Sequence, residues 1–149
     1  KVEAQIKFGW EVDAYPVNEI VEAVNAVSQA DIDTLVEEYY DKYEILLEGR
    51  DPEEFRKHVA VQAQIELGFE RFLEEKNYQA IVTHFGDLGV LKQLPGLAIQ
   101  RLMEKGYGFG GEGDWKTAAM GIEAVYIDGD TTIRNLQNEL RWNSMYFSK

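Results

Sequence analysis

Short apolar segments alternate with longer helical patterns along this chain, and that order constrains the fold more than any other feature. The segment YQAIVTHF, residues 78–85, is typical of a strand, and so are YGFGG, residues 107–111, and EAVYID, residues 123–128. A helical pattern lies between each of these segments and the next. Strands separated by helices pair in parallel through crossover connections. The sequence therefore predicts an α/β fold.

Helical patterns dominate the first half of the chain. Apolar residues fall at helical spacing over residues 17–27 and 32–43, after a short segment, Asp13 to Val17, that we expect to be a strand ended at Pro16. The run Asp51-Pro52-Glu53-Glu54 predicts the start of a long helix, because an N-cap side chain, a proline in the first turn and acidic residues are all favourable there. This helix is expected to end near Asn77.

The second half of the chain completes the expected architecture. A helix over residues 94–105 should end at Gly106, a helix should open at DWKTAAM, and Asp130 should cap a last helix. The resulting fold is a three-layer, mostly parallel sheet flanked by helices, Rossmann- or flavodoxin-like, in one domain over residues 1–149. Ligand sites in such sheets lie beyond the carboxyl ends of the strands, which here means residues 85–88, residues 110–114 and Asp128.

Composition excludes several classes of function. With 149 residues and 45% hydrophobic content, the chain fits one packed domain. A net charge of -12 argues against a nucleic-acid partner and against an anionic membrane surface. No apolar run approaches the roughly 20 residues of a membrane span. The absence of cysteine fits a reducing compartment, so we expect a cytoplasmic protein. Because the chain begins at Lys1, we expect a processed chain or a piece of a longer one.

The glycine-rich stretch YGFGGEGDWKTAAM, residues 107–120, is the candidate site. Residues 106–111 match G-x-G-x-x-G, but a dinucleotide fingerprint follows a strand and opens a helix, whereas Gly106 ends a helix. We reject that interpretation. Glu112 and Asp114 leave a strand end on a flexible frame and could hold a hard divalent cation or move a proton. The alternative is that they cap the helix beginning at Trp115, and residue types favour capping by roughly two to one.

The two histidines carry a weaker signal. His58 lies in the long helix beside Arg56 and Lys57 and is expected at the surface. His84 stands near a strand end and could point into a site, although for a lone histidine a core or surface position is favoured by about three to one. No Ser/His/Asp or Cys/His arrangement can be assembled from this sequence.

Two blocks of sequence strongly resemble the L-arabinose isomerase family. The first comprises AQIKFGW, Ala4 to Trp10, and GDLGVLKQLPGLAIQRLMEKGYGFGGEGDWKTAA, Gly86 to Ala119. The second is the terminal ELRWNSMYF, Glu139 to Phe147. Residues 1–120 resemble the middle domain of the family, and residues 121–149 resemble its carboxyl-terminal strand and helix.

The resemblance implies a chemistry and its residues. Members interconvert an aldopentose and a ketopentose, L-arabinose and L-ribulose, by shifting a proton between neighbouring carbons with a divalent metal, typically Mn²⁺. Glu112 would be the metal ligand and the acid or base, and Phe85 would line the substrate pocket. Gly111 and Gly113 would let the sugar approach the backbone. Three residues at the helix start would support and orient the motif: Asp114, Trp115 and Lys116.

The chain also departs from the family pattern. The resemblance implies much longer members, whose amino-terminal domain and most of whose carboxyl domain have no counterpart here, including a second catalytic glutamate and two metal-binding histidines. Gly86 stands where the family commonly has an acid. Two hypotheses follow: an isomerase that completes its site from elsewhere, or a non-catalytic scaffold or assembly domain derived from one. The resemblance leaves a homo-oligomer open.

Overall fold

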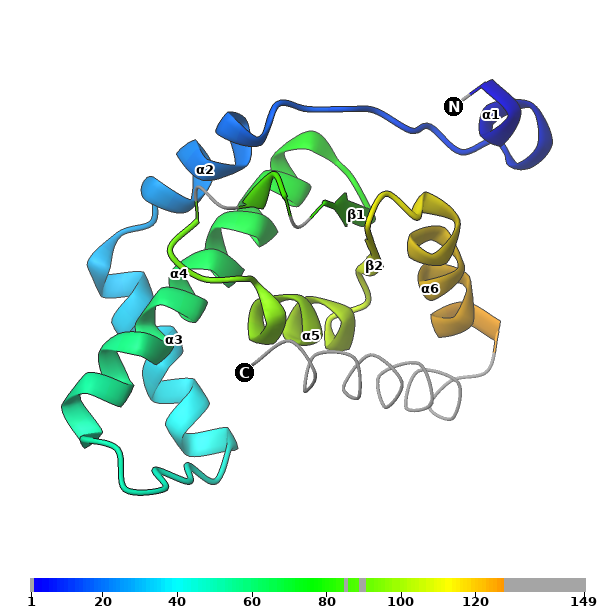
Figure 1. The fold of residues 1–149 in the computed structure, drawn as a ribbon. Helices are drawn as coiled ribbons and strands as arrows, with labels where there is room; N and C mark the ends of the chain where they lie inside the picture. Colours follow the sequence, from blue (N-terminus) through cyan, green and yellow to red (C-terminus); the bar gives the residue numbers. More distant parts are fainter. Residues whose placement is uncertain (1, 85, 89–90, 128–149) are drawn as a thin grey trace.

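A computed structural model describes residues 2–84, 86–88 and 91–127 and confirms the α/β class. The chain path is shown in Figure 1, where the two strands lie in the middle of the molecule and α1 lies apart from the other helices. The described residues form six helices and two strands: α1 (Val2–Phe8), α2 (Val17–Asn25), α3 (Gln29–Lys42), α4 (Pro52–Lys76), β1 (Ala80–Thr83), α5 (Gly96–Glu104), β2 (Gly108–Gly111) and α6 (Trp115–Ile127).

The two strands pair in parallel, as the sequence predicts. Their register runs from Ala80 opposite Gly108 to Thr83 opposite Gly111. The intervening α5 makes the crossover that parallel strands require. Both strands lie inside segments predicted to be strands. The described sheet has these two strands, and the larger three-layer sheet stays a prediction.

The glycines of β2 are explained by the helix that packs on them. Successive side chains of a strand point to opposite faces, so Gly108 and Gly110 share the face that meets α6, while Phe109 packs against the helical core on the other face. A Cβ added to Gly110 would lie 2.0 Å from the carbonyl oxygen of Asp114, and one added to Gly121 would lie 3.6 Å from the Cα of Gly108. The close approach of α6 to β2 therefore requires glycine at position 110, whereas a Cβ on Gly121 would make an ordinary contact.

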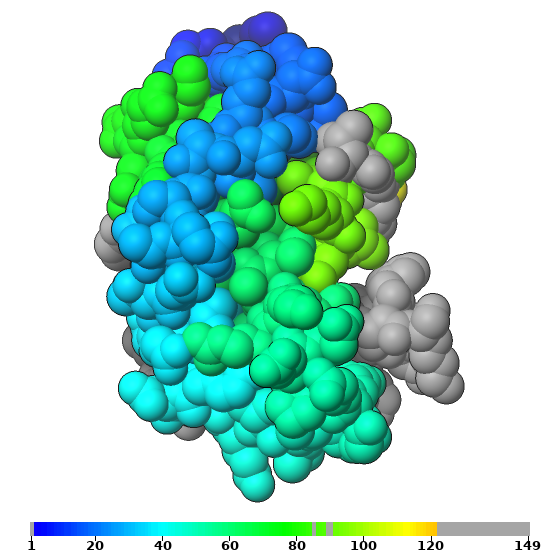
Figure 2. Space-filling model, turned by 90° about the vertical axis from the view of Figure 1, so that its left-hand side faces the viewer, coloured from blue at the N-terminus to red at the C-terminus, as the bar shows by residue number. Residues whose placement is uncertain are grey.

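The longest helix, α4, organises the helical side of the fold. The Asp51 side chain accepts a hydrogen bond from the Glu54 amide at 2.9 Å, and Asn77 ends the helix in the left-handed region with φ of 59°. Both ends fall where the sequence predicts them. Helices α2, α3 and α5 pack on α4. Helix α2 lies on the second half of α4, where the side-chain amide of Gln64 donates a hydrogen bond to the carbonyl of Val24, and Figure 2 shows α3 beside the first turns of α4. None of the described helices is long and apolar enough to cross a membrane.

Two apolar clusters make up the core around α4. The first joins α2, α4 and α5 through Ile20, Val24, Ile65, Phe69, Phe72, Leu73, Ala98, Ile99 and Leu102. The second joins α3 and α4 through Val27, Ile32, Leu35, Val36, Tyr39, Val59 and Ala63. Apolar residues at helical spacing supply both clusters, which is why the sequence pattern located these helices.

A buried ionic network joins α3, α4 and α5. Glu66 is fully buried, and its Oε2 accepts hydrogen bonds from the Tyr39 hydroxyl at 2.5 Å and from Nε of Arg101 at 2.8 Å. Within the described part of the chain, no donor makes a hydrogen bond of good geometry to the second oxygen, Oε1, but the ammonium group of Lys105 lies 3.0 Å away and balances its charge. Burial and the bond to Glu66 raise the pKa of Tyr39. Burial alone would lower the pKa of Arg101, yet hydrogen bonds to Tyr43 and nearby carboxylates raise it.

The strand expected at Asp13 to Val17 is not formed. Residues 9–16 have no regular structure, and Val17 is the first residue of α2. Pro16 lacks the N–H that a sheet ladder needs. The carboxylate of Asp13 instead accepts a hydrogen bond from the hydroxyl of Tyr78, so this segment is fastened by side chains rather than by backbone pairing.

The prediction of a strand at EAVYID is also wrong over residues 123–127, the part that the structure describes. Helix α6 continues from Trp115 through Ile127, whereas Asp128 and the helix expected after Asp130 lie outside the described residues. A short apolar run does not distinguish a strand from a buried helix by its periodicity. Good helix formers at Ala118, Ala119 and Met120 precede it, and no proline intervenes, so the helix propagates through the run.

Candidate functional site

The carboxyl ends of the two strands bring His84 and Glu112 together. Thr83 and Gly111 are the last paired residues, so the next residue of each strand is a neighbour of the other. Nε2 of His84 lies 3.3 Å from Oε2 of Glu112. Both side chains are a little more than half exposed, at 58% and 52%. The edge of the sheet therefore presents an imidazole and a carboxylate that solvent or a ligand can reach.

A tight turn after β2 sets the position of Glu112. The amide of Asp114 donates a hydrogen bond to the carbonyl of Gly111 at 3.1 Å, which closes the turn. Both central residues have positive φ, 53° for Glu112 and 84° for Gly113, as in a type I′ turn. A positive φ is uncommon for a residue with a side chain. Glu112 is thus held in a conformation that the turn, rather than its own preference, determines.

Asp114 caps α6, as the capping interpretation of the sequence expects for this residue. Its Oδ1 accepts hydrogen bonds from the amides of Thr117 at 3.1 Å and Lys116 at 3.2 Å, and its Oδ2 accepts one from the hydroxyl of Thr117 at 2.7 Å. These bonds, chiefly those with Thr117, hold the pKa of Asp114 below its usual value. The cap fixes the start of α6, and with it the end of the turn that carries Glu112.

An aromatic contact connects this turn to the amino-terminal part of the chain. The ring of Trp115 meets that of Trp10 edge-on at 6.5 Å, and Trp10 stacks on Phe8 at 4.6 Å. The ammonium group of Lys116 lies 5.7 Å from the Trp115 ring centre. Residues far apart in the sequence therefore meet at one side of the candidate site.

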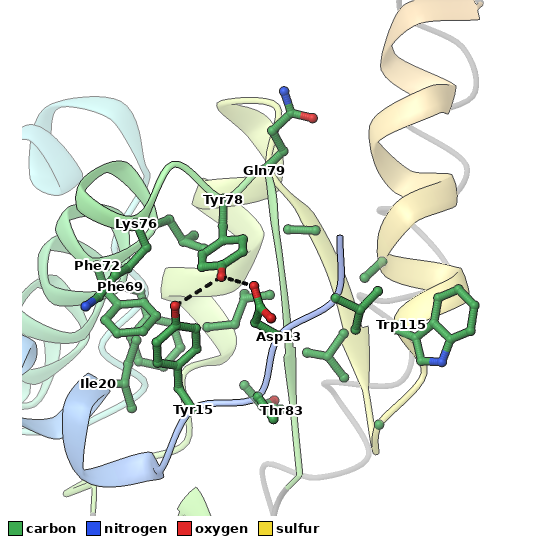
Figure 3. Close-up of a pocket in the computed structure, with 18 of the residues that line it drawn as sticks. Asp13, Tyr15, Ile20, Phe69, Phe72, Lys76, Tyr78, Gln79, Thr83 and Trp115 are labelled. Atoms are coloured by element: carbon green, nitrogen blue, oxygen red, sulfur yellow. Dashed lines mark hydrogen bonds between the residues drawn. The ribbon is translucent and has the colours of Figure 1, made fainter. Parts of the chain in front are cut away.

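A groove of about 1310 Å³ opens beside β1. Residues 9–18 form one wall and residues 76–84 another, and Gly113 and Trp115 line the end near the turn. Figure 3 shows the hydroxyls of Tyr15 and Tyr78 and the carboxylate of Asp13 pointing toward one another inside it. The bonds to Asp13 and then Tyr15 raise the pKa of Tyr78. Since His84 also lines the groove, the candidate site lies at its rim.

The other predicted residues are distributed as follows. Phe85 lies outside the described residues. His58 is on α4, where Gln93 Nε2 lies 2.9 Å from its Nδ1. A Cβ added to Gly111 would meet open space, so packing does not require glycine there. Among the described residues, no group of three or more histidine, aspartate or glutamate side chains is arranged to hold a metal ion.

His84 is the site residue that sequence reasoning undervalues. Taken alone, it is a histidine without a motif. The available signal is the parallel pairing itself: the predicted strands end near His84 and before Glu112, and the carboxyl ends of parallel neighbours meet at one edge. The exact register is needed to make the two side chains adjacent, and the sequence pattern does not fix it.

These features define an α/β domain with a candidate acid–base site at the carboxyl ends of parallel strands. Comparison with known proteins identifies the domain more closely. The family model for the L-arabinose isomerase central domain matches residues 1–128. The L-arabinose isomerase of Serratia proteamaculans is 53% identical over 130 residues, 87% of this chain and 26% of the relative. An L-arabinose isomerase of Clostridium acetobutylicum is 54% identical over 120 residues, 80% of this chain and 25% of the relative.

The chain therefore belongs to the L-arabinose isomerase family, as the resemblance predicts. It spans about a quarter of the length of the relatives it matches. The division of the chain near residue 120 stays a prediction.

Proposed function

We propose that this chain carries part of the active site of an L-arabinose isomerase, with Glu112 as the group that moves a proton between neighbouring carbons of the sugar. Family membership supports the reaction class. The observation that carries the proposal is the position of Glu112, held at positive φ directly after β2, accessible, and 3.3 Å from His84. Strained backbone conformations cluster at active sites and ligand clamps.

Proton transfer between two carbons needs a group that accepts a proton and then returns it. A carboxylate does this when it lies within hydrogen-bond reach of both positions. Glu112 is suited to the task because the turn fixes its backbone while its carboxylate stays half exposed. The open space around Gly111 would let a sugar lie against the backbone beside Glu112. The proposed substrates are L-arabinose and L-ribulose, and the proposed compartment is the cytoplasm.

The described residues do not fit a complete site for the Mn²⁺ that the family implies. Such a cation takes several oxygen or nitrogen ligands, and affinity grows with their number and geometry. Glu112 and His84 are a pair, and no group of three suitable side chains is present in the described part of the chain. We therefore propose that ligands from beyond these residues complete the metal site.

A second function is favoured by this same incompleteness. A domain that supplies two adjacent ligating side chains, and no third among its described residues, could serve as a non-catalytic scaffold derived from an isomerase. The two functions differ in what Glu112 does. In the first it contacts the sugar, and in the second its carboxylate is dispensable.

The test combines turnover with binding. The purified chain is incubated with L-arabinose and Mn²⁺, ketose formation is measured, and amide resonances are followed by NMR on addition of sugar without metal. Glu112→Gln keeps the side-chain shape but cannot act as a base. Glu48→Gln is the matched control, because Glu48 is also an exposed glutamate with positive φ, 51°.

Three outcomes separate the hypotheses. Turnover that is lost in Glu112→Gln and kept in Glu48→Gln supports an enzyme that needs no further residues. Sugar-dependent shifts at Gly111 to Gly113 without turnover support a site completed from elsewhere, which is the result we expect. The absence of both turnover and sugar-dependent shifts would sink the proposal and leave the scaffold hypothesis.

A further inference from the structure

We infer that His84 is the positioning residue for Glu112, donating a hydrogen bond from Nε2 that directs the carboxylate toward the ligand. The inference rests on the proposed function for its purpose, but the contact itself is tested without turnover. The first observation is the distance of 3.3 Å between Nε2 of His84 and Oε2 of Glu112. The two residues share one edge of the sheet because the strands that precede them end in register, with Thr83 opposite Gly111.

The orientation of the imidazole ring is fixed from its other nitrogen. The amide of Gly86 donates a hydrogen bond to Nδ1 of His84 at 3.2 Å. A nitrogen that accepts a hydrogen bond carries no proton, so in the neutral ring the proton is on Nε2. Nε2 is the nitrogen that faces Glu112. Asp87 Oδ2 lies 3.8 Å from Nδ1, beyond hydrogen-bond distance, and leaves this assignment unchanged.

Gly86 makes room for this arrangement. A Cβ added there would lie 3.1 Å from both Cε1 and Nδ1 of His84, closer than ordinary contact. A side chain at position 86 would therefore crowd the ring that faces Glu112. The glycine and the histidine thus form one local arrangement, in which the ring occupies space that a side chain would contest.

The strength of the contact depends on the surrounding water. His84 and Glu112 are both more than half exposed, and exposed pairs contribute little to folding. When a ligand covers the rim of the groove and displaces water, the same hydrogen bond acts in a lower dielectric and becomes stronger. His84 should therefore affect the geometry of the bound state much more than the stability of the fold.

The contact is tested by NMR of the histidine ring nitrogens at about pH 8.5, where an ordinary imidazole is neutral. We expect Glu112→Gln to shift the Nε2 resonance of His84, because a charged acceptor is replaced by a neutral one. We expect Gly86→Ala to shift both ring nitrogens of His84. The ring-nitrogen resonances of His58, which lies on α4 and contacts the side chain of Gln93, should not shift in either variant. Unchanged His84 resonances in both variants would overturn the inference.

Functional variants then separate positioning from the proposed function. His84→Leu removes the donor, whereas His84→Gln keeps an N–H at a similar reach. Where the chain turns over sugar, His84→Leu should lower kcat about 10- to 100-fold with KM little changed, and His84→Gln should restore part of it. Where it binds sugar without turnover, His84→Leu alone should weaken the sugar-dependent shifts at Gly111 to Gly113. Equal behaviour of wild type and His84→Leu contradicts positioning, and loss of all sugar response in wild type contradicts the proposed function.

Discussion

The helical core and the rim at the strand ends differ in the exposure of their charged side chains. In the core, Glu66 is fully buried and Arg101 is 4% exposed, and each makes several polar contacts from different helices. At the rim, His84 and Glu112 are more than half exposed and approach each other at 3.3 Å. The first arrangement fixes helices relative to one another, and the second leaves its groups accessible to a ligand.

The backbones of the two regions differ in the same sense. The helices that supply the core are regular and are capped by ordinary means, as at Asp51 and Asn77. The rim depends on a turn with two successive positive φ values, at Glu112 and Gly113. The regular region supplies stability, and the irregular region presents the candidate site residues. Backbone conformations that are unfavourable in isolation persist in the irregular region because a rigid scaffold supports them.

The largest effect should come from breaking the core network. Arg101→Leu removes the hydrogen bond from Nε to Glu66 and leaves a buried carboxylate with less compensation. We expect the free energy of unfolding to fall by about 3–5 kcal/mol, the usual cost of removing one partner of a buried pair. Urea denaturation measures it. Arg56→Leu is the control, since the Arg56–Glu37 pair is exposed and should contribute at most about 1 kcal/mol.

A second variant sharpens that result. Replacing all three buried groups, as Glu66→Met with Arg101→Leu and Tyr39→Phe, removes the unpaired charge, the ion pair and the hydroxyl that donates to Glu66. We expect it to recover much of the lost stability, because a well-packed apolar pair often substitutes for a buried ionic one. Equal losses in Arg101→Leu and Arg56→Leu would show that burial does not distinguish the two pairs.

The next effect concerns the sheet that supports the rim. Gly110→Ala places a Cβ 2.0 Å from the carbonyl oxygen of Asp114 and 3.3 Å from the Cβ of Ala118, so α6 must move away from β2. We expect a loss of about 1–3 kcal/mol, typical of overpacking, and faster amide exchange in the first turns of α6. Gly96→Ala is the matched control, because a Cβ there meets open space. A loss in the control as large as in Gly110→Ala would contradict the steric explanation.

A smaller effect is expected at the cap of α6, and it should depend on pH. The hydrogen bonds from Thr117 and Lys116 lower the pKa of Asp114 in the folded state. A lowered folded pKa means that the stabilisation is complete above the ordinary value of about 3.9 and is lost as the pH falls through the lower folded value. Asp114→Asn still caps the helix but does not titrate. The stability difference between wild type and Asp114→Asn should therefore shrink below about pH 4, and a constant difference would refute this linkage.

The fold is predictable to the extent that local patterns decide it. Apolar spacing and capping residues locate α4 and α5, and the helix between two apolar runs indicates the parallel pairing of β1 with β2. The failures occur where the local pattern is ambiguous. The segment near Asp13 has strand-like residues but is fastened by the Tyr78 hydroxyl, and the run after Gly121 continues a helix that begins at Trp115.

Of the two residues that face each other in the candidate site, the sequence predicts one, Glu112. The glycine frame and the carboxylate of Glu112 stand out by composition, because so many glycines beside two acids are unusual in a short stretch. His84 carries no such signal, because its importance comes from a register, Thr83 opposite Gly111, and from the amide of Gly86. Tertiary neighbours of this kind are set by strand pairing rather than by sequence spacing. The roles assigned to Phe85, Gly111, Gly113, Trp115 and Lys116 stay predictions.

The smallest effect should be that of Mn²⁺ on folding, and it sharpens the contrast between core and rim. A cation that binds the native state stabilises it by RT ln(1 + [L]/Kd), so millimolar metal on a millimolar site adds only about 0.4 kcal/mol. We expect a shift of this order, because the rim presents Glu112 beside His84 and no group of three ligands among the described residues. Thermal unfolding with and without Mn²⁺ measures it, and Glu112→Gln should abolish what little shift there is, while Glu48→Gln should keep it. A stabilisation of several kcal/mol in wild type that disappears in Glu112→Gln would show instead that the chain assembles a complete metal site at its rim.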